Sequence, residues 1–230
     1  MSATTPSTAT PRGSFLIPTA TKQAWGFMIG SSFFAIGSAP VVADALGSTG
    51  SNLLFFVGAW FFTTAGLMQL FLSGAVSVPV AYGPGRMVRA EWLTAATQSF
   101  GTIMFNVSTT AALYAKSTRA EEEFVWNPDA GGSVAFLGSG FFAFVAFSRA
   151  GGSLTNLASR SWWSVFINFV GCVAFGISAV GAFILPSGET LSDAYATWGT
   201  FIGAICFFLA SLIVLPQWDR PEVGATAVSA

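Results

Sequence analysis

Residues 53–75, LLFFVGAWFFTTAGLMQLFLSGA, form a run without a single charged side chain. An α-helix rises 1.5 Å per residue, so about 20 apolar residues are enough to cross the hydrocarbon core of a bilayer. A run of this length therefore predicts a transmembrane helix rather than a helix of a soluble core.

Five more apolar runs flank this one, and the composition of the whole chain agrees with them. Of 230 residues, 53% are hydrophobic and 8% are charged, whereas an ordinary soluble domain is about 25% charged. We therefore predict an all-α integral membrane protein with a single six-helix transmembrane bundle at residues 22–217. The expected spans are 25–46, 53–75, 92–115, 132–149, 162–185 and 195–216. The flanking segments 1–21 and 218–230 are expected to be disordered tails.

The basic residues predict the orientation, because Lys and Arg of short loops favour the cytoplasmic side. With both termini inside, that side carries Arg12, Lys22, Arg86, Arg89, Arg149, Arg160 and Arg220. Only Lys116 and Arg119 fall outside, next to the acidic residues Glu121–Glu123 and Asp129. The sequence thus predicts a multi-pass protein of the cell membrane with cytoplasmic N- and C-termini.

A glycine followed four residues later by a phenylalanine recurs in every expected span. The glycines are Gly30, Gly58, Gly101, Gly138, Gly171 and Gly203. Positions 0 and +4 share one face of a helix, and small residues allow helices in lipid to approach closely. We therefore predict that these six glycines mediate helix packing within the bundle. The alternative use of the same faces is contact with a second copy.

The first, third and fifth spans share a further feature, a basic residue three positions before a tryptophan. The pairs are Lys22 and Trp25, Arg89 and Trp92, and Arg160 and Trp163. The glycines of these spans, Gly30, Gly101 and Gly171, are 71 and 70 residues apart. This internal repeat predicts three tandem helical hairpins, at 22–75, 89–150 and 160–217.

The paired segments FMIGSSFFAIGS (27–38) and FFVGAWFFTTAGLMQLF (55–71) resemble the YrhK-like bacterial membrane proteins. Those are small two-helix modules of uncharacterised function. The resemblance is best over 25–72 and 162–216 and weaker in the middle hairpin. It implies paired membrane helices, and it offers no catalytic residue that could be assigned to this chain.

Several kinds of chemistry are disfavoured by composition. Histidine is absent, and Cys172 and Cys206 both lie in apolar runs, so we expect no metal site, disulfide or cofactor. No charged residue is expected near the middle of a span, which argues against a pump or an ion-coupled transporter. No base accompanies a serine in the spans, which argues against an enzyme. A net charge of −1 gives no basic surface for nucleic acid.

Four amides are the remaining polar groups of interest within the spans, namely Gln69, Gln98, Asn106 and Asn168. They either form hydrogen bonds between helices or line a small polar pocket on the bundle axis. The segment 116–132, KSTRAEEEFVWNPDAGG, is expected to be an outside loop. Its charges are either simply solvated or bind a partner or a cation through Glu121–Glu123 and Trp126.

The leading functional prediction is a non-enzymatic membrane module that packs with itself or with a partner membrane protein. The alternative is a carrier or passive pathway for a small neutral or apolar solute. A pathway requires a cavity lined by the amides, whereas a module packs them shut. The sequence identifies neither a solute nor a partner.

Overall fold

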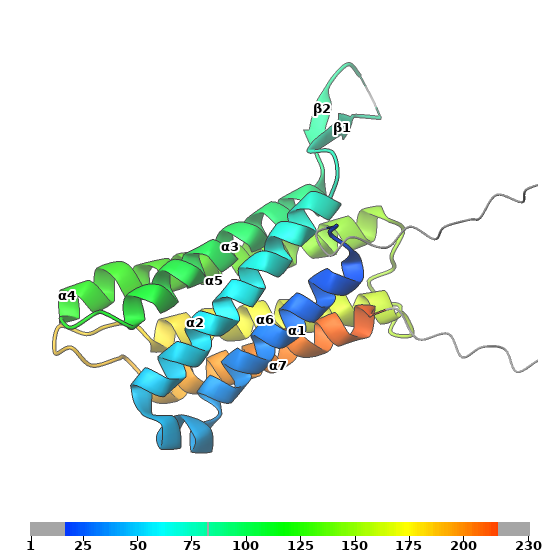
Figure 1. The fold of residues 1–230 in the computed structure, drawn as a ribbon. Coiled ribbons are helices and arrows are strands. Elements are labelled where there is room, and N and C mark those ends of the chain that lie inside the picture. The colour runs from blue at the N-terminus through cyan, green and yellow to red at the C-terminus, as the bar shows by residue number, and fades with distance from the viewer. Residues whose placement is uncertain (1–16, 82, 216–230) are drawn as a thin grey trace, which may run out of the picture.

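The computed structural model of the chain describes residues 17–81 and 83–215. In this part, six long helices lie side by side in a bundle (Figure 1). They are α1 (Ala20–Ser38), α2 (Pro40–Leu72), α3 (Ala90–Ala112), α5 (Asn127–Arg149), α6 (Arg160–Gly181) and α7 (Asp193–Val214). Of the predicted tails, 218–230 and most of 1–21 lie outside the described residues, and Ala20 already belongs to α1.

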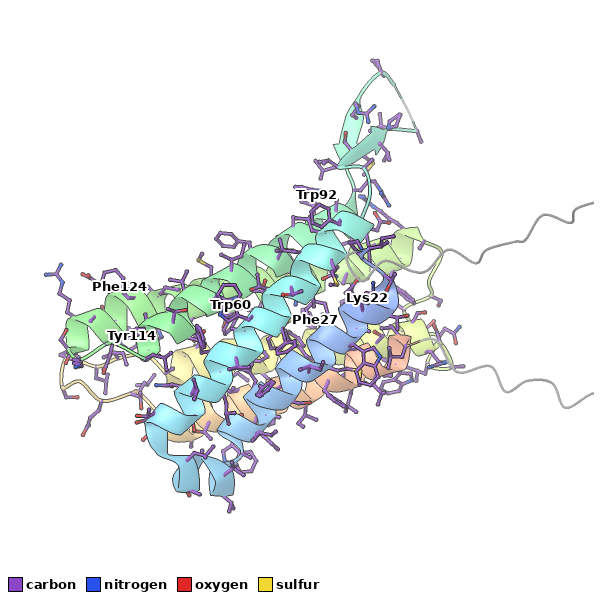
Figure 2. All side chains as sticks on the ribbon, in the orientation of Figure 1. Lys22, Phe27, Trp60, Trp92, Tyr114 and Phe124 are labelled. Atoms are coloured by element: carbon purple, nitrogen blue, oxygen red, sulfur yellow. The ribbon has the colours of Figure 1, made fainter. Side chains whose placement is uncertain are left out.

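Four helical segments of the described chain are long and apolar enough to cross a membrane. They are Pro40–Leu72, Thr118–Arg149, Arg160–Gly181 and Asp193–Val214. Large apolar side chains project from the bundle, among them those of Trp60 (55% exposed) and Phe124 (58% exposed) (Figure 2). Such an apolar surface indicates contact with a lipid bilayer. The all-α architecture and these helices therefore fit a multi-pass membrane protein.

The six long helices form a closed ring in which each helix packs against two neighbours. The order around the ring is α1, α2, α3, α5, α6 and α7, and α7 contacts α1 again. The most extensive contacts occur within three helix pairs, namely α1 with α2, α3 with α5, and α6 with α7.

Side-chain oxygens cap the starts of several helices. Thr19, Ser159 and Ser192 precede α1, α6 and α7, and each accepts a hydrogen bond from the backbone N–H three residues later. Such a cap satisfies an N–H that has no partner inside the helix and contributes about 1 kcal/mol. The two serines place the starts of α6 and α7 two residues before the predicted positions.

The predicted first span, 25–46, is wrong at its C-terminal end. Helix α1 ends at Ser38, and Pro40 begins α2 after a single extended residue, Ala39. Proline has no N–H and disfavours a helical backbone in the preceding residue, but it suits the first turn of a helix. Helix α2 then kinks at Gly47, whose φ of 65° is a conformation that glycine adopts without strain.

The segment 116–132 is mostly helical, so the prediction of a loop is wrong. Helix α4 (Thr118–Ala120) leads into the π-helix η1 (Glu121–Trp126), and η1 continues directly into α5. The Ser117 hydroxyl caps this start, and glutamate is a good helix former. Pro128 lies in the first turn of α5, where its missing N–H is tolerated. As a result, Asp129 lies inside a helix that is apolar enough to span a membrane.

A short antiparallel β-hairpin joins α2 to α3 and projects from one end of the bundle (Figure 1). Its strands are β1 (Ser77–Pro79) and β2 (Arg86–Val88). We call this end the β-hairpin end and the opposite end, which carries α4, the α4 end.

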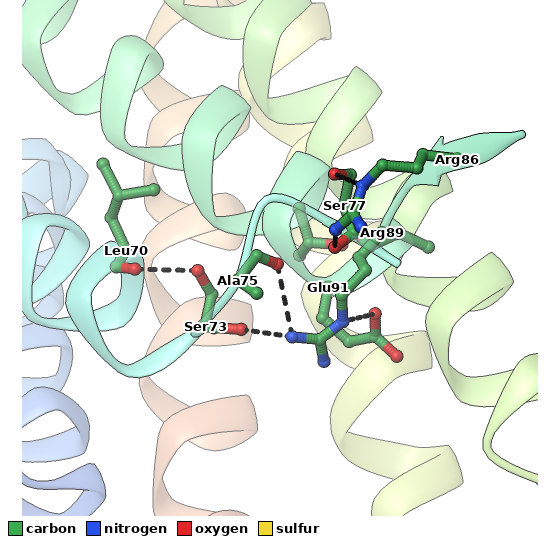
Figure 3. A network of polar contacts seen from close by, with 9 residues as sticks. Leu70, Ser73, Ala75, Ser77, Arg86, Arg89 and Glu91 are labelled. Carbon is green, nitrogen blue, oxygen red and sulfur yellow. Dashed lines mark hydrogen bonds and ion pairs between the residues drawn. The ribbon is translucent and has the colours of Figure 1, made fainter. Parts of the chain in front are cut away.

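Arg89 fastens the base of the hairpin to the end of α2 (Figure 3). Its guanidinium donates to the carbonyl oxygens of Ser73 at 2.9 Å and Ala75 at 3.4 Å. The Arg89 Nε also lies 3.4 Å from a carboxylate oxygen of Glu91 in the first turn of α3. One arginine thus connects the C-terminal cap of α2 with the start of α3.

Candidate functional site

Six phenylalanines, one from each long helix, fill the axis of the ring. We call them the Phe layer: Phe34, Phe62, Phe105, Phe136, Phe175 and Phe207, none more than 4% exposed. Each follows a glycine of its own helix by four residues. Because all six point to the axis, the +4 position of the motif marks the inward face of every long helix.

The rings of the Phe layer are in contact with one another. Within the three helix pairs α1–α2, α3–α5 and α6–α7, the ring centroids are 5.2 Å apart for Phe34–Phe62, 5.0 Å for Phe105–Phe136 and 5.2 Å for Phe175–Phe207. Across pairs, Phe34, Phe105 and Phe175 form a triangle with sides of 6.2, 6.2 and 5.6 Å. These spacings are typical of attractive aromatic pairs. The layer is therefore one packed aromatic cluster.

The glycines of the motif allow the backbones of paired helices to approach closely. A β-carbon added at Gly30 would lie 2.9 Å from the carbonyl oxygen of Gly58, and one at Gly58 would lie 3.0 Å from that of Gly30. A β-carbon added at Gly203 would lie 3.2 Å from the carbonyl oxygen of Gly171. No larger residue fits these positions without a shift of the helices, as in other tightly packed membrane helix pairs.

In the pair of α3 and α5, the glycine of α5 that packs against α3 is Gly132. The prediction that Gly138 has this role is wrong. A β-carbon added at Gly101 or at Gly132 would lie 3.0 Å from the carbonyl oxygen of the other residue. A β-carbon at Gly138 would meet nothing within 4 Å. Six residues correspond to a rotation of about 240° on a helix, so Gly138 faces a different direction from Gly132. Its glycine–phenylalanine spacing is a coincidence of composition.

A cavity of about 230 Å³ lies between the Phe layer and the β-hairpin end. We call it the amide cavity, because Gln69, Gln98 and Asn168 line it together with Gln23. Gln98 is 4% exposed and has no hydrogen-bond partner in the described chain, and the Gln69 Oε1 is buried without one. The structure thus brings three of the four predicted amides together. The Phe207 ring lines this cavity on the side of the Phe layer.

Asn106, the fourth predicted amide, lies elsewhere. Its Nδ2 donates to the carbonyl oxygen of Ala59 at 3.0 Å and to the hydroxyl of Thr63, so it joins α3 to α2. The two interpretations of the amides therefore apply to different residues. Asn106 forms an interhelical hydrogen bond, and the other three line a cavity.

A second cavity, of about 410 Å³, lies between the Phe layer and the α4 end. We call it the acidic cavity, because Glu121 and Asp129 line it and no Lys or Arg of residues 17–81 and 83–215 does. Phe34, Phe105 and Phe175 border it on the side of the Phe layer. Hydroxyl groups from several helices also line it, including those of Ser51, Ser108, Thr109, Ser178 and Thr200.

Asp129 is the residue of this site that the sequence analysis missed. Asp129 precedes the expected span 132–149, but it lies one helical turn before Gly132, inside the helical segment Thr118–Arg149 that is apolar enough to cross a membrane. A signal was present in the sequence. Phe55, Asp129 and Thr200 each precede the packing glycine of their helix by three residues, and all three line the acidic cavity. The correspondence depends on Gly132, and not Gly138, being the packing glycine of α5.

The two cavities approach each other from opposite ends of the ring. Phe207 lines the amide cavity, Phe175 lines the acidic cavity, and their ring centroids are 5.2 Å apart. The arrangement offers two polar compartments that are separated by one layer of aromatic side chains. The chain matches no family model, no curated protein and no solved structure in the comparisons with known proteins.

Proposed function

We propose that this protein is a non-enzymatic passive pathway or carrier for a small uncharged solute across a membrane. The amide and acidic cavities are its two vestibules, and the Phe layer is a closed gate between them. The observation that carries the proposal is that the two cavities lie on opposite sides of one aromatic layer. Phe207 lines the amide cavity, Phe175 lines the acidic cavity, and their ring centroids are 5.2 Å apart. A module that served only packing would have no need to leave two cavities at the axis. It would also provide the buried Gln98 side chain with a hydrogen-bond partner.

All six long helices span the membrane in this proposal, including α1 and α3. Helix α3 is less apolar than the four candidate spans because it carries Thr94, Gln98, Ser108 and Thr109. Each of these side chains lines one of the two cavities. A helix that faces a polar compartment on one side tolerates such residues inside a bilayer. The low hydropathy of α3 thus supports its place beside a pathway.

The charges support the predicted orientation, in which the amide cavity faces the cytoplasm. Lys22, Arg86, Arg89, Arg149 and Arg160 belong to the β-hairpin end. Glu121–Glu123 and Asp193 belong to the α4 end. Among the described residues, the basic ones at that end are Lys116 and Arg119. This asymmetry matches the cytoplasmic bias of Lys and Arg, so the acidic cavity opens to the outside.

The Phe layer limits the class of solute. An ion would have to shed its water to pass the rings, and a charge in the middle of a bilayer costs about 2.5–3.5 kcal/mol or more. Hydrophobic constrictions of this kind gate by excluding water. The amide cavity, at about 230 Å³, is also smaller than a drug-sized pocket. We therefore assign a small neutral solute that amides and hydroxyls can solvate.

The proposed pathway is built from three copies of one helical hairpin. The pairs Gly30–Gly58, Gly101–Gly132 and Gly171–Gly203 hold corresponding places, and each is followed by two residues of the Phe layer. Phe27, Gln98 and Asn168, each three residues before the glycine of its helix, all line the amide cavity. This correspondence supports the repeat. Kinship with the YrhK-like proteins is a separate prediction that rests on the sequence motif alone.

Solute flux into proteoliposomes tests the proposal. The full chain is reconstituted, and light scattering follows swelling in gradients of glycerol or urea. Phe175→Leu keeps the position apolar but removes one ring of the Phe175–Phe207 contact and so loosens the gate. The flux should therefore rise above that of the parent. Phe71→Leu is the matched control, because Phe71 is 78% exposed on the outer surface. If vesicles with the parent and vesicles with Phe175→Leu swell no faster than empty vesicles in both glycerol and urea, the pathway does not exist.

A further inference from the structure

We propose that the acidic cavity is a binding site for a small organic cation of the ammonium type. The first observation is the charge balance of its wall. Asp129 lines the cavity and has no hydrogen-bond or ion-pair partner in the described chain. Arg119, a basic residue of the same end, pairs with Glu123 at 2.8 Å and does not line the cavity. A partly buried carboxylate without a partner favours a cation beside it.

The second observation is an unpartnered hydroxyl in the same wall. The side chain of Ser51 lines the cavity and is only 8% exposed, and its oxygen has no hydrogen-bond partner among the residues that the structure describes. A buried polar atom without a partner is uncommon in a native protein and costs free energy. A ligand that donates a hydrogen bond or carries a hydroxyl would satisfy it. Ser51 and Asp129 come from α2 and α5, so they present polar groups from two different helices.

The remaining wall is aromatic, which selects the kind of cation. Phe34, Phe105 and Phe175 form the side next to the Phe layer, and Trp126 forms part of the lateral wall. The indole of Trp126 is held in place, since its Nε1 donates to the carbonyl oxygen of Ala179 at 2.8 Å. Aromatic faces attract ammonium groups, and cages of aromatic side chains bind quaternary ammonium ligands. Ca²⁺ instead requires six to eight oxygen ligands.

The volume of about 410 Å³ leaves room for a ligand of the size of choline. This inference rests on the proposed function in one respect, the consequence of binding. A quaternary ammonium ion cannot lose its charge and therefore cannot cross the Phe layer. Once bound in the outer vestibule, it should obstruct the flux of the neutral solute.

Calorimetric titration of the full chain in mild detergent tests the binding itself. Choline is compared with 3,3-dimethyl-1-butanol, which has the same shape and hydroxyl but no charge. Choline should bind at least about tenfold more tightly than the neutral alcohol, and Asp129→Asn should reduce this preference, with Glu121 left as the remaining carboxylate of the wall. Glu122→Gln is the matched control, because Glu122 is exposed in the neighbouring η1 and does not line the cavity. This variant should bind choline like the parent.

The outcomes separate the two proposals. Equal binding of choline and the alcohol, or unchanged choline binding in Asp129→Asn, would overturn the cation site whatever the flux assay gives. The comparison of charged and neutral ligand needs no variant, so misfolding of Asp129→Asn cannot mask the answer. Choline binding without solute flux in any variant would leave the site standing and refute the pathway. If both hold, external choline should slow solute flux more strongly in the parent than in Asp129→Asn.

Discussion

Gly132 and Gly138 lie on the same helix, and the structure predicts opposite effects of the same substitution at the two positions. In Gly132→Ala, the new β-carbon would lie 3.0 Å from both the Gly101 carbonyl oxygen and the Phe105 ring. Overpacking of this kind costs about 1–3 kcal/mol. In Gly138→Ala, the β-carbon would meet nothing within 4 Å. The loss of backbone freedom in the unfolded chain should then stabilise the protein by about 0.4–1 kcal/mol.

The two variants should therefore differ in the free energy of unfolding by about 1.4–4 kcal/mol. Thermal unfolding of the full chain in mild detergent, monitored by circular dichroism, measures the order of their melting temperatures. Gly132→Ala should melt below the parent and Gly138→Ala at or above it.

Gly101→Ala serves as an internal control. Its β-carbon would lie 2.6 Å from the ring of Phe136 and 3.0 Å from the carbonyl oxygen of Gly132, so it should be destabilised like Gly132→Ala. Equal melting temperatures for Gly132→Ala and Gly138→Ala would refute the assignment of the packing face of α5. A lower melting temperature for Gly138→Ala than for Gly132→Ala would reverse it.

Two further predictions concern the amides and the orientation. Asn106→Leu should lower the stability by roughly 0.6–2 kcal/mol because it breaks an interhelical hydrogen bond. Gln98→Leu removes no hydrogen bond and should melt close to the parent. A lower melting temperature for Gln98→Leu than for Asn106→Leu would contradict the placement of these amides. With Cys172 and Cys206 replaced by alanine, an impermeant maleimide added to intact cells should label the exposed positions in Ser48→Cys, Thr118→Cys and Ser187→Cys. It should not label Gly83→Cys or Ser153→Cys, and labelling of these last two would reverse the proposed orientation.

The membrane class and the helix count are properties that local sequence can predict. A run such as 53–75 has no charge, and its length alone matches a bilayer. The pairing of helices through glycine and phenylalanine was also predictable in five of six helices, because the +4 spacing depends only on the helical period. Gln98 and Asn168 could be expected to share a location, since they hold the same place relative to Gly101 and Gly171.

Tertiary structure decided the features that depend on where a helix begins and how it is rotated. Helix α5 is the clearest case, because the helical path from Thr118 brings Gly132 and Asp129 into the bundle, whereas composition alone suggested a loop. Gln98 and Asn106 are eight residues apart on α3, yet Gln98 lines a cavity and Asn106 bonds to α2. Eight residues leave the two amides rotated by only about 80°, and the position of the neighbouring helix determines which of them meets a partner. That position is set by packing around the whole ring, which no local pattern contains.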